Sequence, residues 1–238
     1  MLLILLWNSI LLILIFNMYQ KRLFRGSLNE ELMTLVAASK TIVPHFHIPL
    51  QSGSDRILKA MRRRYNTALY REKILQSVER IEGCAVGADV MVGYPGETEE
   101  DFQLMYRFIE LLPLAGLHVF SCSLRPGTTL ARQVENRERK PVPPAEITRR
   151  HRELSDLGRM KEGHFKSHFI GKECMVLFEA SKFLANGILQ CSGYTRNYLR
   201  VLVESSDRLK LQAFRGKELP VMIDSLDDDL NLKGRVLS

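Results

Sequence analysis

Three apolar stretches of this chain each lead directly into a polar loop that contains glycine. The first lies within residues 45–55 (His-Phe-His-Ile-Pro-Leu-Gln-Ser-Gly-Ser-Asp). We expect a short strand over 47–50 and a turn over 51–54. The other two stretches occupy residues 86–98 and 117–128. Amphipathic stretches separate the three, and parallel strands need such crossover segments between them. The repeat therefore predicts an α/β fold with a parallel sheet.

The direction of the strands predicts where the three loops lie. In a parallel sheet the loops after the strand ends gather on one rim, and ligands bind there. The loop after the first strand carries Gln51, Ser52 and Ser54, the second begins at Gly93, and the third contains Arg125. We expect these loops to meet in one place.

Composition limits the kind of protein and its partners. The chain has 238 residues, 45% hydrophobic and 26% charged, which is typical of one large or two modest globular domains. Its net charge of +7 favours a polyanionic partner such as nucleic acid. No pair among Cys84, Cys122, Cys174 and Cys191 has the spacing of a zinc or iron–sulfur loop, so the sequence predicts reduced thiols and no metal ligands.

The first segment of the chain differs from the rest. Residues 1–16 are almost wholly apolar and are followed by Lys21, Arg22 and Arg25. A membrane span needs about 20 apolar residues, and the positive charge and cleavage site of a secretory signal are lacking. We expect residues 1–26 to lie outside the fold and the protein to be cytoplasmic, without a stable membrane partner; weak membrane association and a true anchor remain the alternatives.

The pattern changes once more near residue 169. Before it, helical periodicity alternates with the strands, a capping box at residues 98–101 opens one helix, and a long helix covers 145–168. After it, short alternating strands with polar turns predict a small antiparallel β-barrel. The predicted domains are residues 27–168 and 169–238.

Two basic regions are candidate nucleic-acid contacts. The long helix carries basic residues expected on its outer side, as a solvated face or an RNA-facing strip: Arg149, Arg150, Arg152, Arg159, Lys161 and Lys166. The barrel interleaves aromatic and basic residues that could stack bases and neutralise phosphate: Lys172, Tyr194, Arg196, Asn197, Tyr198 and Arg200. The alternative for the barrel is a hairpin whose tyrosines pack on its core.

These motifs, in this order, resemble the radical S-adenosylmethionine (SAM) methylthiotransferases. The resemblance is carried by residues 45–55, 61–65, 87–98 and 125–128. It continues into 177–179 and 193–198, which look like the family's RNA-binding TRAM domain. It covers the chain from about residue 27 to the end. It implies a partial parallel (β/α) barrel, a truncated radical SAM fold, followed by a small antiparallel TRAM-like barrel.

The resemblance also implies a reaction. Family members attach a methylthio group to C2 of a modified adenosine beside the tRNA anticodon, using SAM and [4Fe–4S] clusters. Residues 117–128 look most like the branch that acts on threonylcarbamoyladenosine, although Ser121 and Cys122 depart from its pattern. The isopentenyladenosine branch and the branch that modifies a ribosomal protein aspartate are the alternatives. The implied partner is the anticodon stem-loop, bound by a monomer.

One part of the family pattern is missing. Family members have an N-terminal domain and a Cys-x-x-x-Cys-x-x-Cys loop that holds the cluster, and neither is found here. The chain therefore looks like a C-terminal fragment, which we expect to be inactive alone and to carry no catalytic residue. A non-catalytic RNA-binding fragment is the second hypothesis.

SAM offers ribose hydroxyls, an adenine edge and a zwitterionic methionine end. We expect Gln51, Ser52 and Ser54 to face its ribose or methionine part, and Gly93 and Pro95 to let the backbone approach adenine. Asp89 is either a structural hydrogen-bond hub or points towards ligand. His118 is either a core histidine or a ligand residue. Arg125 suits a carboxylate or phosphate.

Overall fold

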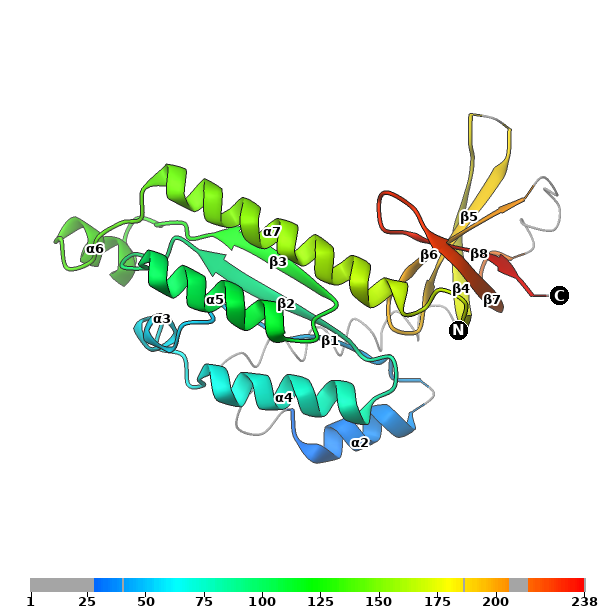
Figure 1. Cartoon of the computed structure of the whole chain (residues 1–238), viewed down its shortest axis with the longest axis horizontal. Helices are drawn as coiled ribbons and strands as arrows, with labels where there is room; N and C mark the ends of the chain where they lie inside the picture. Colours follow the sequence, from blue (N-terminus) through cyan, green and yellow to red (C-terminus); the bar gives the residue numbers. More distant parts are fainter. Residues whose placement is uncertain (1–27, 40, 186, 206–213, 238) are drawn as a thin grey trace.

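The computed structural model describes residues 28–39, 41–185, 187–205 and 214–237. These residues form a three-stranded sheet with helices beside it and a small barrel, arranged along one long axis (Figure 1). The predicted N-terminal segment of residues 1–26 lies outside the described residues. Within the described part, no helix has the length and apolar character that a membrane crossing requires.

The sheet consists of β1 (His45–His47), β2 (Ala85–Val92) and β3 (Gly116–Ser121), in that order and with both pairings parallel. The predicted parallel α/β arrangement is confirmed. The first strand was expected over residues 47–50, whereas the regular pairing covers His45–His47. The chain stays beside β2 beyond this point, because the N–H groups of Ile48 and Leu50 donate to carbonyls of β2 at 2.8 and 3.0 Å.

Six described helices accompany the sheet: α2 (Glu30–Ala38), α3 (Asp55–Ala60), α4 (Thr67–Arg80), α5 (Glu99–Leu111), α6 (Thr129–Glu135) and α7 (Pro144–Ser167). The predicted capping box is present at the start of α5, where Thr98 and Asp101 bond each other's backbone N–H. The sequence did not predict α6, because its short, charged segment has little apolar periodicity. Thr128 nonetheless caps it by accepting from Ala131 N.

The two faces of the sheet have different environments. Along β2, Val86, Ala88, Val90 and Val92 are fully buried against the helices, whereas the alternate residues are only half-buried. On β3, His118 and Phe120 are exposed. We call this second side, which is the more exposed one in the described part of the chain, the uncovered face; it carries residues 87, 89 and 91 of β2 and residues 118 and 120 of β3.

The second part is a closed barrel of β4 (Glu173–Phe183), β5 (Leu189–Thr195), β6 (Arg200–Ser205), β7 (Glu218–Leu226) and β8 (Leu232–Val236), in the order β4-β5-β6-β8-β7. The barrel was predicted, but not as a mixed one: β6 and β8 are parallel and the other pairs antiparallel. Five strands cannot alternate in direction all the way round a closed ring, so one parallel pair is required.

The barrel contacts the sheet at the end where the strands begin. Asn197 Nδ2 donates to the carbonyl of Gly83 at 2.8 Å, and an Arg196 guanidinium nitrogen lies 3.4 Å from the carbonyl of Ser39. Both acceptors precede strands of the sheet. In Figure 1 the arrows of β2 and β3 point away from the barrel, so the loops after the strands lie at the opposite end.

A substitution in the first of these loops tests its close packing. A Cβ at Gly53 would lie 2.6 Å from the Met105 Cα, which belongs to the backbone of α5 and cannot rotate away. We expect Gly53→Ala to lower the free energy of unfolding by about 1–3 kcal/mol in chemical denaturation. Gly116→Ala is the control, since no described atom lies within 4 Å of its added Cβ. Equal stability of the two variants would contradict the packing.

Candidate functional site

A buried carboxylate joins the loop after β1 to the loop after β2. Asp101 is 4% exposed and accepts from Ser54 Oγ at 2.7 Å, Arg56 Nε at 3.1 Å and Thr98 N at 2.8 Å. Arg56 also donates to the carbonyl of Gly96 at 2.6 Å. Burial alone would raise the pKa of Asp101, but the bonds from Arg56, Thr98 and Ser54 lower it well below its usual range.

A second buried carboxylate shapes the loop after β2. Glu97 accepts from the N–H groups of Gly93 and Tyr94 at 3.0 and 3.3 Å, and from Arg150 at 2.9 Å. Burial raises the pKa of Glu97, although Arg150 acts against this shift. Gly93 has φ +78°, and an added Cβ would lie 2.7 Å from Ile147 Cγ1. The loop thus requires glycine at this position.

The structure corrects the placement of two basic residues of the long helix. Arg150 and Lys166 were predicted on its outer side, but both are buried, with 4% and 8% exposure. Arg150 binds Glu97, and Lys166 donates to the carbonyl of Leu230 at 2.8 Å. The spacing of Ile147, Arg150 and Leu154 on one helix face could have indicated that Arg150 points inward.

The polar residues predicted on the first loop are buried. Gln51, Ser52 and Ser54 are 5%, 2% and 2% exposed. Gln51 Oε1 accepts from Arg63 at 3.0 Å, and Ser52 Oγ accepts from Ser54 N at 3.2 Å. These atoms hold the loop in shape; direct contact with ribose or methionine stays a prediction.

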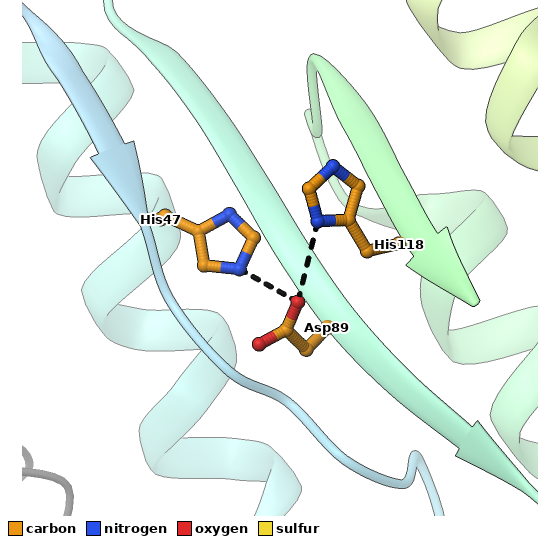
Figure 2. A group of neighbouring side chains, drawn as sticks. All are labelled: His47, Asp89 and His118. Carbon is orange, nitrogen blue, oxygen red and sulfur yellow. Dashed lines mark hydrogen bonds and ion pairs between the residues drawn. The ribbon is translucent and has the colours of Figure 1, made fainter. Parts of the chain in front are cut away.

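Three side chains meet on the uncovered face, one from each strand (Figure 2). Asp89 Oδ1 lies 2.7 Å from His47 Nε2 and 3.6 Å from His118 Nδ1. The register explains the arrangement: Asp89 pairs with His118, and His47 pairs with Gly87, the next residue before Asp89 on the same face. We call His47, Asp89 and His118 the triad.

The triad bears on two pairs of alternatives left by the sequence. Asp89 is hydrogen-bonded, as expected of a structural hub, and it lies on the uncovered face; its contact with a ligand stays a prediction. The His118 side chain is 78% exposed, so its interpretation as a core histidine is wrong. Burial alone would raise the pKa of Asp89, but the bond from His47 and the charges of both histidines lower it overall.

The remaining rim residues lie around the second and third loops. Gly93 and Pro95 are buried, and the Pro95 carbonyl lies 3.5 Å from an Arg139 nitrogen. Arg125 is exposed, and its carbonyl accepts from Thr128 Oγ1 at 2.8 Å. Their contact with a ligand stays a prediction.

The predicted RNA-contacting residues of the barrel divide into two groups. Tyr194 and Tyr198 are 37% and 39% exposed with ring centroids 5.9 Å apart, and Arg200 and Lys172 are exposed. The two tyrosines are therefore not core residues of the hairpin. Asn197 is buried and, like Arg196, bonds the sheet part, so these two side chains join the two parts of the protein.

A cavity of about 420 Å³ lies between the uncovered face and the barrel. Its lining includes residues of both parts: His45, His47, His118, Lys166, Tyr198 and Arg200. The sequence did not predict it, because it forms only where the two parts meet.

The cysteines do not fit an iron–sulfur cluster. Cys84 and Cys122 belong to the sheet part and Cys174 and Cys191 to the barrel, and Cys84 and Cys191 are buried. A [4Fe–4S] cluster needs thiolates that converge. Burial raises the pKa of all four thiols, that of Cys84 to about 12, which favours the protonated form.

Comparison with known proteins shows which family the chain is similar to. Residues 22–109 match the profile of the Radical SAM superfamily. The chain is 36% identical over 182 residues to threonylcarbamoyladenosine tRNA methylthiotransferase MtaB of Aquifex aeolicus, covering 74% of this chain and 43% of that protein. The chain is thus similar to the radical SAM methylthiotransferases over about three quarters of its length.

Other relatives include a second branch of this family. The tRNA-2-methylthio-N(6)-dimethylallyladenosine synthase of Endomicrobium trichonymphae is 34% identical over 177 residues, covering 74% of this chain and 40% of that protein. Among solved structures, coproporphyrinogen III oxidase HemN of Escherichia coli has a TM-score of 0.46 at 12% identity, over 72% of this chain and 45% of that one. The chain spans about two fifths of the length of these curated relatives.

The Asp101 network leads to a prediction about stability and pH. Asp101→Asn removes a carboxylate with three described partners, so we expect the free energy of unfolding at neutral pH to fall by about 2 kcal/mol. The pKa of Asp101 in the folded state lies below its ordinary value of 3.8. Its contribution is therefore complete above about pH 5 and is lost progressively as the pH falls below about 4 towards the lower pKa of the folded state.

Unfolding by denaturant at neutral pH and in acid measures both effects. Glu100→Gln is the matched control, because Glu100 is an exposed acid in the same first turn of α5. The variant Asp101→Asn should lose less stability in acid than the unmodified chain. An unchanged acid dependence would show that Asp101 is not the group responsible.

Proposed function

We propose that this chain takes part in SAM-dependent methylthiolation of tRNA at C2 of N6-threonylcarbamoyladenosine, next to the anticodon. The observation that carries the proposal is the parallel sheet whose three loops follow the family's order of motifs, together with relatives named as tRNA methylthiotransferases. Preference for the threonylcarbamoyladenosine branch rests on residues 117–128. Dimethylallyladenosine and a ribosomal protein aspartate are the alternative substrates.

The loops after the strands are the proposed place of SAM. Gly93 and Pro95 would lie beside the adenine, Arg125 would pair with the carboxylate, and the uncovered face with Asp89 and His118 would border the cofactor. Bound SAM supplies the methyl group and, with a reduced cluster, the radical. The side chains of Gln51 and Ser54 bind Arg63 and Asp101 and so shape the first loop. In this proposal the loop presents Gln51, Ser52 and Ser54 to the ribose or methionine part of SAM.

In this proposal the two predicted domains have different binding roles. Residues 27–168 form the part that faces the cofactor, and residues 169–238 form the part that contacts RNA. The exposed Tyr194, Tyr198, Lys172 and Arg200 support RNA contact, since aromatic rings stack unpaired bases and cations neutralise phosphate. We propose a cytoplasmic monomer that recognises the anticodon stem-loop.

The cysteine positions predict that this polypeptide does not cleave SAM by itself. After anaerobic reconstitution with iron and sulfide, we expect no stoichiometric [4Fe–4S] cluster and no 5′-deoxyadenosine, because the described thiols lie on separate elements. Iron and sulfide analysis with chromatography of the SAM products measures this. A bound cluster with SAM turnover would contradict the prediction.

Binding of an anticodon stem-loop tests the RNA-contacting surface. Replacing Lys172 and Arg200 together by Ala should weaken binding and reduce the slope of log affinity against log salt by about one for each phosphate that is no longer neutralised. Tyr198→Ala should weaken binding by about 1–3 kcal/mol, because the ring no longer stacks on a base. Fluorescence anisotropy over a salt series measures both.

The control for this experiment is Arg107→Ala, which removes an exposed cation from α5 in the sheet part. It should leave affinity and salt slope close to those of the unmodified chain. Equal effects of Arg107→Ala and Arg200→Ala would indicate attraction by net charge alone and would count against a specific barrel surface.

A further inference from the structure

We propose that the triad of His47, Asp89 and His118 is a binding site for one divalent transition-metal ion of the zinc type. Each residue offers one ligand atom, and the three atoms lie within 4.8 Å of one another. They come from three neighbouring strands and point towards one another on the uncovered face (Figure 2). This site is distinct from any iron–sulfur cluster, because it contains no thiolate.

The backbone places the three donors without distortion. The register puts Asp89 opposite His118, and His47 on the other neighbouring strand beside the same point of β2. Zn–N and Zn–O bonds are about 2.0–2.2 Å, so donors on one tetrahedral ion lie roughly 3.3 Å apart. The His118–Asp89 distance of 3.6 Å is close to this value, and the 2.7 Å His47–Asp89 contact has to open by less than about 1 Å.

Side-chain rotation can supply this adjustment. The His118 side chain is 78% exposed, so its ring can turn towards an ion without displacing core atoms. Asp89 already orients the ring of His47 through Nε2. When an ion binds at Nε2, the proton on that nitrogen leaves, and the neutral ring then carries its proton on Nδ1. The triad is thus partly assembled before an ion enters.

The donor set selects the class of ion. Two imidazole nitrogens and one carboxylate oxygen suit Zn²⁺, Fe²⁺ or Co²⁺, whereas Mg²⁺ and Ca²⁺ prefer oxygen ligands. Three protein ligands leave a fourth position for water or another oxygen donor. His47 and His118 also line the cavity of about 420 Å³ beside the barrel, so the fourth position can be reached from that cavity.

Two other features of the described chain could bind the same ions and must be separated from the triad. His164 and His168 are exposed, lie one helical turn apart on and beside the end of α7, and have ring centroids 4.6 Å apart. The four cysteines are thiols with a high affinity for zinc. Both can be recognised by substitution or by spectroscopy.

The test is titration of the full 238-residue chain with Zn²⁺ by calorimetry and with Co²⁺ by absorption spectroscopy. We expect one Zn²⁺ per chain in a background in which His164 and His168 are both Ala. In that background, each single substitution in the triad should weaken Zn²⁺ binding by about tenfold or more. The three variants are His47→Ala, Asp89→Asn and His118→Ala. The bound Co²⁺ should show ligand-field bands without the thiolate charge-transfer bands.

His118→Ala is the most informative variant, because this exposed side chain can be removed with little effect on folding. Circular dichroism should confirm the fold of Asp89→Asn, which loses the bond to His47. The proposal is overturned if His118→Ala binds Zn²⁺ as tightly as its parent, if binding disappears with His164 and His168, or if Co²⁺ reports thiolate ligands. None of these results depends on tRNA or SAM binding.

Discussion

The buried carboxylate of Asp101 is the interaction on which the loop end of the sheet depends. It accepts hydrogen bonds from Ser54, Arg56 and Thr98, and these bonds hold the loop after β1 against the start of α5. A buried charge is stable only when its partners are all present. The first two loops are therefore tied to each other by buried bonds, and their polar side chains are largely used for holding one another.

The parallel sheet also separates two possible binding regions. The loops lie where the strands end, and the barrel contacts residues that precede the strands. β2 has 8 residues, which at about 3.3 Å per residue gives 8 × 3.3, or about 26 Å, between the two ends. In the proposed function, RNA bound by the barrel and SAM bound at the loops would therefore lie towards opposite ends of the uncovered face.

Local patterns in the sequence predicted most elements of this fold. The alternation of β2, the capping box at Thr98 and the short strands of the barrel each depend on neighbouring residues, so they can be read from a few positions. The parallel pair β6–β8 and the cavity beside the barrel depend on contacts between distant residues. No local pattern carries that information, which explains why these features were missed.

The triad illustrates the same limit within the candidate site. Asp89 stands out in the sequence because it interrupts an apolar strand. Its partners His47 and His118 are 42 residues before it and 29 residues after it in the chain (89 − 47 and 118 − 89). Only the register shows that all three occupy one face. On the other face of β2, Val86, Ala88, Val90 and Val92 are fully buried, so a charge there would lose its hydration. The uncovered face leaves Asp89 partly hydrated. The open side of the sheet is thus what permits a polar cluster in the middle of an otherwise apolar strand.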